Sequence, residues 1–242
     1  MKMYFYLFLA IASLNAQVTS QSKNSPISVL SSVKSVDIKD SNEIITFDPL
    51  WVDSLSLSLP CYEVPVPKRT MRLPNAPRNY RNGTHRGLDF FANWGTPVRS
   101  VAEGVVVRSD LHYEEVPADF RENLLKATTK VGHTPSDIFN SVLLGKSVFL
   151  DHGFDLIPGF RTISIYAHLS HIEKEIVPGA IVKRGELLGK SGNTGMREST
   201  IGSKAGSHLH WEMILQKGEQ EIYLGKGMSN PELYDMLFRI FN

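Results

Sequence analysis

The chain has 242 residues, enough for one sizeable hydrophobic core or two smaller ones. Hydrophobic residues make up 42% of it and charged residues 21%, the composition of an ordinary folded protein. With 26 basic and 25 acidic residues the formal net charge is only +1, so nothing calls for a nucleic-acid partner. Cys61 is the only cysteine, which excludes an intrachain disulfide and a cysteine-rich zinc site.

The first residues have the pattern of a secretory signal peptide. A basic start, Met1–Met3, precedes an apolar run that ends at Ala12, and small residues follow near Ala16 and Ser20. The run is too short for a comfortable membrane span; a buried N-terminal helix is the alternative. We therefore expect residues 1–20 to be a signal peptide. The mature protein would be exported to the periplasm or the cell exterior, without stable membrane insertion.

Residues 21–74 are expected to be a leader and an extended N-terminal segment. Polar residues dominate up to about residue 45, as in a flexible leader. Leucines then alternate with serines over residues 55–59, which predicts a strand. Prolines and a cluster of arginines fill residues 60–84 without a periodic pattern, which predicts an extended, loop-like segment.

The following sequence predicts a mainly β fold. Short apolar runs alternate with glycine-bearing turns, the pattern of an antiparallel sheet or sandwich. The expected strands are Thr96–Val101, Val105–Val107, Ser147–Leu150, Thr162–Tyr166, Ile181–Val182 and the stretch from His208 onward. Residues 109–146 interrupt this pattern with two helical spacings, and we expect a small helical insertion there. Pro231–Phe238 predicts a last amphipathic helix.

The stretch Ser207–Glu212 contains the most suggestive side chains. As a β-strand it places His208, His210 and Glu212 on one face and apolar residues on the other. Two histidines two residues apart lie about 7 Å from one another at the backbone. They could share a metal ion, or one could bind a metal while the other acts on substrate. Two solvated histidines on a surface strand are the alternative.

Three further residues are candidates for the same site. His85 and Asp89 are four residues apart, which on a straight strand is about 13 Å and too far to share a metal ion. Gly87 between them permits a bend that could bring them together. His168 ends a predicted strand. For each of these three residues the alternative is a solvated side chain without a functional role. The remaining histidines have no stronger claim to a role, and His152 is expected to be a turn residue.

Taken in order, these motifs resemble those of the lysostaphin-type zinc metallopeptidases, the cell-wall endopeptidases that include the LytM and β-lytic enzymes. The resemblance runs from about Pro74 to about Leu233. It rests on His85–Phe90, Trp94–Val98, Glu103–Val106, Leu150–Gly153, Tyr166–Leu169, Val182–Glu186, Gly192–Gly195 and His208–Glu212.

The resemblance implies an antiparallel β-sheet or sandwich with a groove, in a metallopeptidase domain over residues 75–242. It implies these roles: Zn2+ ligands His85, Asp89 and His210, and catalytic histidines His168 and His208. Such a ligand set agrees with a catalytic zinc site, which has three protein ligands and an open position. Because the chain has no His-Glu-x-x-His motif, a histidine beside the metal is the natural general base. Glu212 could orient a neighbouring imidazole.

The activity implied is that of an exported zinc endopeptidase that hydrolyses peptide cross-links of bacterial peptidoglycan, with peptide stems or cross-bridges as its partners. The alternative is a catalytically silent cell-wall-binding or hydrolase-activating protein on the same fold. Such relatives typically lack some site residues, whereas all five are present here. Val182–Glu186 also suggests a biotinyl- or lipoyl-type carrier, but it lacks the flanking methionines of the modified lysine. The sequence does not indicate an oligomeric state.

Two departures from the family pattern affect the groove. The block 109–146 replaces a short connection, and residues 196–206 lengthen the loop before His208. We expect the first to form a helical cap beside the cleft, since long inserted loops are often functional. Because some relatives are made as latent precursors, we also expect residues 51–80 to lie across the groove and restrain activity.

Overall fold

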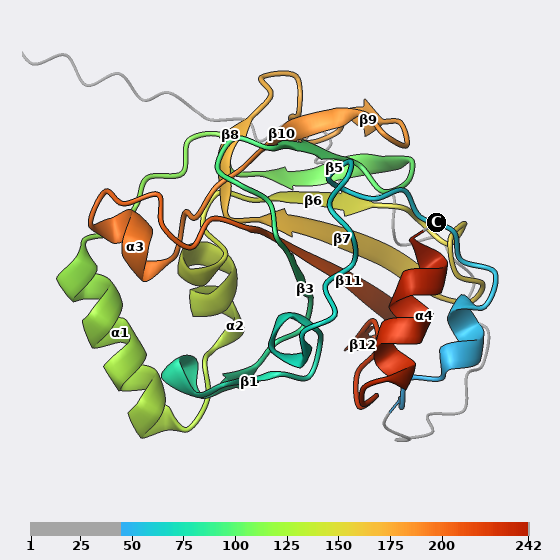
Figure 1. Ribbon diagram of the computed structural model, residues 1–242, viewed down its shortest axis with the longest axis horizontal. Coiled ribbons are helices and arrows are strands. Elements are labelled where there is room, and N and C mark those ends of the chain that lie inside the picture. Colours follow the sequence, from blue (N-terminus) through green and yellow to red (C-terminus); the bar gives the residue numbers. More distant parts are fainter. Residues whose placement is uncertain (1–44, 242) are drawn as a thin grey trace, which may run out of the picture. The chain divides into compact units, whose positions relative to one another are not determined.

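A seven-stranded antiparallel sheet is the central layer of this computed structural model, which describes residues 45–241 (Figure 1). Its strands, in spatial order, are β12 (Gln220–Tyr223), β11 (Leu209–Lys217), β7 (Arg161–Ala167), β6 (Val148–Asp151), β5 (Gly104–Ser109) and β9 (Ile181–Val182), with β3 (Leu88–Phe90) also paired to β11. The predicted signal peptide and the polar part of the leader lie outside the described residues. No helix within residues 45–241 has the length and apolar character that a membrane crossing needs.

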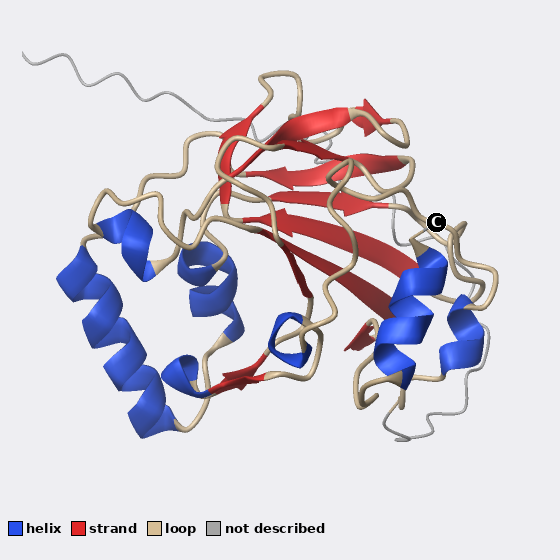
Figure 2. Ribbon diagram, viewed as in Figure 1, coloured by secondary structure: helices blue, strands red, loops and turns tan. Residues whose placement is uncertain are grey.

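A second, three-stranded antiparallel sheet lies beside the first. It consists of β4 (Pro97–Arg99), β10 (Leu187–Ser191) and β8 (Leu169–Ile172), and a small hairpin is formed by β1 (Pro77–Arg78) and β2 (Gly83–Thr84). His168 is the single residue between β7 and β8, so it lies where the chain passes from the large sheet to the small one. The prediction of a mainly antiparallel β fold is confirmed (Figure 2).

Strand β11 shows why the apolar alternation was a reliable signal. Leu209, Trp211, Met213 and Leu215 are fully buried in the main hydrophobic core, as a period of two requires. The opposite face is also buried, because a second, smaller apolar cluster that includes Ile214 covers it. The polar side chains on that face therefore lie inside the protein and not in solvent.

Residues 109–146 supply much of this second cluster. They contain α1 (Ala118–Val131), α2 (Ser136–Ile138) and the π-helix η5 (Phe139–Leu143), so the insertion is helical as predicted. Helix α1 ends at Gly132, whose φ of +85° is the left-handed conformation that glycine adopts readily. Phe139 and Leu143 pack against the sheet. The insertion thus covers the face of the sheet that carries His210 and Glu212.

The remaining helices are short, and one of them closes the core. They are η2 (Pro49–Val52), η3 (Thr70–Arg72), η4 (Asn79–Arg81), α3 (Arg197–Thr200) and α4 (Glu232–Ile240). Helix α4 buries Leu233, Met236, Leu237 and Ile240, the i, i+3, i+4, i+7 spacing of an amphipathic helix. The predicted C-terminal helix is confirmed, displaced by one residue at its start.

Residues before the boundary predicted at residue 75 pack into the same hydrophobic core as residues after it. The described residues, 45–241, belong to one compact unit, and Leu57, Cys61 and Leu73 lie in its main core. The strand predicted at residues 55–59 is wrong. Leu57 N–H donates to Ile240 O at 2.7 Å and Ser58 N–H to Val101 O at 3.0 Å, so the extended segment bonds to a helix end and a loop and not to a neighbouring strand.

If residues 45–74 are integral to the domain, truncating Leu57 must destabilise all of it. We expect Leu57→Ala to lower the free energy of unfolding by about 2–5 kcal/mol, the usual range for a buried leucine. Leu50, which is exposed in the same segment, is the matched control, and Leu50→Ala should change stability by less than about 0.5 kcal/mol. Urea unfolding measures both. Equal stability of the two variants would mean that this segment is only an appendage.

Candidate metal centre

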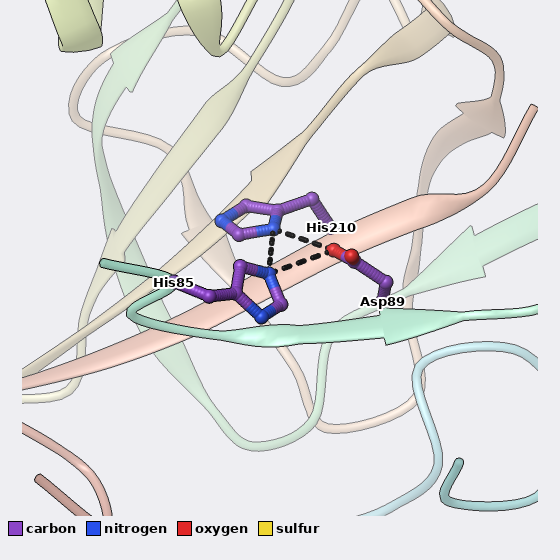
Figure 3. A group of neighbouring side chains, drawn as sticks. All are labelled: His85, Asp89 and His210. Atoms are coloured by element: carbon purple, nitrogen blue, oxygen red, sulfur yellow. Dashed lines mark hydrogen bonds and ion pairs between the residues drawn. The ribbon is translucent and has the colours of Figure 1, made fainter. Parts of the chain in front are cut away.

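Three side chains from two distant parts of the sequence meet at the junction of β3 and β11 (Figure 3). His85 Nε2 lies 2.9 Å from Asp89 Oδ1 and 3.1 Å from His210 Nδ1, and His210 Nδ1 lies 2.8 Å from Asp89 Oδ1. Asp89 on β3 is the direct cross-strand partner of His210 on β11, which explains how these two meet. His85 reaches them from the turn before β3.

This turn needs a glycine at Gly87 because the backbone there lies very close to β11, and not because its backbone angles are unusual. A Cβ atom at residue 87 would lie 2.2 Å from the carbonyl oxygen of Trp211 and 2.8 Å from Glu212 Cγ. Only a glycine therefore lets the turn lie against β11. His85 and Asp89 are brought together as the sequence suggested, although the glycine serves contact with the neighbouring strand.

The outer nitrogen of each histidine is held by an acceptor. His85 Nδ1–H donates to Leu73 O at 2.8 Å, and His210 Nε2–H donates to Glu212 Oε1 at 2.8 Å. A carbonyl or a carboxylate can only accept, so in the neutral form of each ring the inner nitrogen, His85 Nε2 or His210 Nδ1, carries the lone pair. Glu212, which the sequence suggested could orient a neighbouring imidazole, therefore orients that of His210.

The charges of the cluster follow from burial and from these contacts. Burial alone would raise the pKa of Asp89, but the surrounding His85, His208 and His210 hold this pKa well below its usual value. Burial would lower the pKa of His210, yet hydrogen bonds to Asp89 and Glu212 raise it to about 9. Contact with His210 likewise outweighs burial and lowers the pKa of Glu212. Both carboxylates are thus anionic at neutral pH with a protonated His210 between them, and a metal ion bound there would take the place of the proton on His210 Nδ1.

The geometry of the three inner atoms fits a metal ion. Zinc bonds of 2.0–2.2 Å at tetrahedral angles separate ligand atoms by about 3.3 Å. The separations of 2.8–3.1 Å need only a slight outward movement to accept it. Two imidazole nitrogens and one carboxylate oxygen form a suitable donor set, and histidines with a bonded outer nitrogen are typical of metal sites.

Two more histidines lie beside this cluster with a common orientation. His168 Nδ1–H donates to Thr194 O and His208 Nδ1–H to Gly206 O, both at 2.8 Å, which leaves each Nε2 as an acceptor. His208 Nε2 lies 3.5 Å from Asp89 Oδ1, and the two imidazole rings are 4.9 Å apart. Burial and the neighbouring histidines hold the pKa of His168 well below its usual value, so its ring is neutral. Such a ring can accept a proton.

His168 has a backbone φ of +62°, in the left-handed region that is unusual for residues other than glycine. Its N–H donates to Leu144 O at 2.9 Å, so the insertion helps to hold this conformation. Strained backbone of this kind is found at functional sites, where the surrounding structure fixes it.

All five histidine and aspartate candidates line one pocket of about 260 Å³. The other residues of its wall are Arg78, Tyr80, Arg81, Arg121, Phe139, Leu143, Leu144, Gly195 and Met196. Arg78 Nη2 contacts Asp89 Oδ2 at 2.9 Å, so the second carboxylate oxygen is occupied and Oδ1 faces the cluster. Of the segment 51–80, only Arg78 and Tyr80 belong to the described wall. Six of its apolar residues lie in the core instead: Val52, Leu55, Leu57, Cys61, Val66 and Leu73. Only the end of the segment therefore reaches the groove, and its restraint of activity stays a prediction.

The sequence interpretation missed the arginines of this wall and misjudged one histidine. The arginine cluster before His85 was visible, but no spacing rule connects it to the site. His152 was expected to be a turn residue, yet it is buried, with Nδ1 2.6 Å from Glu103 O and Nε2 2.7 Å from Ser164 Oγ. It is a structural histidine, whose pKa is lowered by burial.

Comparison with known proteins supports the resemblance seen in the motifs. The sequence model described as "Peptidase family M23" matches residues 127–222, which include His168, His208 and His210. An "Uncharacterized metalloprotease" of Buchnera aphidicola is 26% identical over 141 residues, covering 58% of this chain and 26% of that protein. The chain therefore spans about a quarter of the length of this curated relative. The resemblance to lysostaphin-type peptidases is confirmed by the family match.

Several solved structures are similar over part of the chain. The catalytic domain of lysostaphin from Staphylococcus simulans is 20% identical, with 70% of this chain and 87% of that chain covered and a TM-score of 0.36. A zinc-containing peptidase from Vibrio cholerae is 20% identical, with 69% of this chain and 36% of that chain covered and a TM-score of 0.37. A putative glycyl-glycine endopeptidase LytM from Ruminococcus gnavus is 20% identical, with 64% of this chain and 47% of that chain covered and a TM-score of 0.38.

Proposed function

We propose that this chain is an exported, zinc-dependent endopeptidase that hydrolyses peptide cross-links of bacterial peptidoglycan. The observation that carries the proposal is the convergence of His85 Nε2, Asp89 Oδ1 and His210 Nδ1, with both outer histidine nitrogens already bonded. The family match supports peptidase chemistry. The order of the motifs supports a peptidoglycan substrate, and the pattern of residues 1–20 supports export.

In this proposal His85, Asp89 and His210 hold the zinc ion, and the pocket provides the open position. When bound there, zinc supplies Lewis-acid polarisation of the scissile carbonyl and lowers the pKa of water. Glu212 accepts from the outer nitrogen of His210, so the inner nitrogen is the one that gives up its proton when the metal binds. Arg78 fixes the rotamer of Asp89 so that a single oxygen faces the centre.

His168 and His208 perform the proton transfers. Each has an acceptor Nε2 directed to the site, because its Nδ1–H is bonded to a backbone carbonyl. One imidazole accepts the proton of the attacking water as general base, and the protonated ring can then stabilise the oxyanion or protonate the leaving amine. A buried, neutral ring such as His168 is suited to the first role.

The alternative of a silent wall-binding or activating protein does not require an intact site. Here the five side chains are present and also oriented by contacts that have no evident use in a binding module. Digestion of purified peptidoglycans of known cross-link type, with mass analysis of the fragments, tests the choice. We expect cleaved cross-links with zinc present and none after chelation. Intact cross-links under both conditions, with the protein bound to the wall material, would favour the silent alternative.

Glu212 offers a test of the metal site away from its ligands. Glu212→Gln removes the charge that holds His210 and leaves Arg86, 3.1 Å from Glu212 Oε2, without its partner. We expect zinc affinity to fall about 10- to 100-fold, as is usual for such supporting carboxylates. Competition with a fluorescent zinc chelator measures it. Glu221→Gln, on the neighbouring strand and exposed, is the matched control and should bind zinc like the unmodified protein.

A further inference from the structure

The pocket contains two buried arginines that form no ion pair with a described carboxylate, although the more distant charge of Glu212 acts on Arg81. Arg81 and Arg121 are 6% and 8% exposed, and they are the only arginines within residues 45–241 that are buried to this degree. Neither forms an ion pair with a described residue, whereas the more accessible Arg78 and Arg86 are paired with Asp89 and Glu212. A buried guanidinium is always charged and is costly unless an anion compensates it.

Existing contacts position these two side chains but leave part of each guanidinium available. Arg121 Nε donates to Gly195 O at 3.0 Å, and its two Nη atoms make no hydrogen bond within the described chain. Arg81 Nη2 donates to Thr84 O at 2.6 Å, and the guanidinium lies 4.6 Å from the ring centre of Phe139. Glu115, which also contacts Gly195, accepts from Gly195 N–H and from the Tyr113 hydroxyl and not from Arg121.

Both arginines lie close to the reacting groups. They line the same pocket of about 260 Å³ as the metal cluster. Arg121 bonds to Gly195, whose neighbour Thr194 accepts the Nδ1–H of His168. In this pocket wall three arginines face a single carboxylate, that of Asp89, which Arg78 already neutralises. A bound divalent metal would add to the positive charge.

We propose that Arg81 and Arg121 form a carboxylate-binding subsite beside the metal centre, so that preferred substrates carry a free carboxylate next to the scissile bond. This inference rests on the proposed peptidase function and specifies its substrate class. The carboxylate belongs either to the end of a peptide or to a side chain. Guanidinium groups suit it because their donors match the two oxygens of a carboxylate.

The insertion 109–146 acquires a role in this proposal. Arg121 belongs to its helix α1, and Phe139, on which Arg81 lies, belongs to its π-helix. The insertion thus supplies one arginine and supports the other. It acts on substrate selection and not on the metal ligands, which all lie outside it.

Three versions of one short peptide test the subsite: one with a free terminal carboxylate, one with a terminal amide, and one amidated at its end but with a side-chain carboxylate next to the scissile bond. We expect the zinc-loaded full chain to cleave one acidic version about 10- to 100-fold more efficiently than the uncharged version, the scale of a charged hydrogen bond lost from a buried site. The version that is preferred identifies the source of the carboxylate. The ratio should fall towards one in Arg121→Gln and Arg81→Gln.

Arg99→Gln is the matched control. Arg99 also donates to a backbone carbonyl, Gly185 O at 3.0 Å, but lies outside this pocket, and its variant should keep the preference. Arg121→Lys and Arg81→Lys retain the charge in case a glutamine variant does not fold, and should show a reduced but measurable preference. Acidic and amidated peptides cleaved equally well by the unmodified protein would overturn the subsite while leaving the peptidase function intact.

Binding without catalysis separates the two proposals further. Fluorescence anisotropy with the metal-free protein should show tighter binding of the acidic peptide than of its amide, and loss of this difference in Arg121→Gln. This result, combined with no cleavage of any peptide, would support the subsite and reject the peptidase function. If the acidic preference survives in both glutamine variants, the arginines do not produce it and the subsite is rejected.

Discussion

Replacing His210 with alanine is expected to abolish both metal binding and hydrolysis. His210 Nδ1 is within 3.1 Å of both other ligand atoms, so its loss leaves two ligands, His85 and Asp89, for one ion. Structural and catalytic zinc sites need at least three protein ligands, and we expect the affinity for zinc to fall by more than about 100-fold. Metal content after dialysis, measured together with peptide hydrolysis, should fall from about one zinc per chain to almost none.

His171→Ala is the control for this experiment. His171 lies on β8 with a side chain 55% exposed, and its replacement should change neither zinc content nor activity. The His210 variant leaves Glu212 buried without its imidazole partner, so its unfolding must be measured as well. A folded His210→Ala protein that retains about one zinc per chain would show that the ion, if bound, is held elsewhere.

The parts of the fold that the sequence predicted well are those in which one physical rule dominates. Strand β11 alternates fully buried apolar residues with polar ones, and the period of two survives because its apolar face is in the core. The C-terminal helix keeps its apolar stripe for the same reason. The apolar spacing within 109–146 predicted helices, and helices are present.

The parts that the sequence did not predict depend on partners that are distant along the chain. Leu57 has the alternation of a strand residue, but its backbone bonds to Ile240, which no local pattern indicates. The meeting of Asp89 and His210 depends on the pairing of β3 with β11, residues 121 positions apart. Secondary-structure propensity reflects only residues that are close in the sequence. It therefore predicts a strand for the leucine segment, whose conformation is determined by tertiary contacts.

The same distinction applies within the site. The motifs indicated all the residues with imidazole or carboxylate groups that converge there, because their spacing resembles a known family. They did not indicate Arg78, Arg81 or Arg121, whose positions follow from the local hairpin and from the inserted helix α1. Side chains supplied by this hairpin and by an inserted helix have no fixed spacing to the metal motif. The proposed preference for acidic substrates therefore depends on the three-dimensional structure and could not be predicted from the sequence.

His208, just before β11, and His210, within it, provide the last prediction, because the proposal gives them different roles. His208→Ala removes an acceptor Nε2 that lies 3.5 Å from Asp89 Oδ1 and leaves all three inner ligand atoms in place. Zinc content should stay near one per chain while turnover falls by roughly 100-fold or more, the scale of a lost acid–base group. His168→Ala should behave in the same way. Metal content and turnover are measured on the same samples as for His210→Ala.

The comparison of the three variants decides the roles. Loss of zinc in His208→Ala as large as in His210→Ala would make His208 a fourth ligand, for which its distance from Asp89 leaves room after a small rotation. Retained turnover in His208→Ala would remove it from the mechanism and leave His168 as the general base. If one histidine is the base and the other stabilises the oxyanion, the double variant should lose less than the product of the single losses, because the two rings, 4.9 Å apart, act on one transition state.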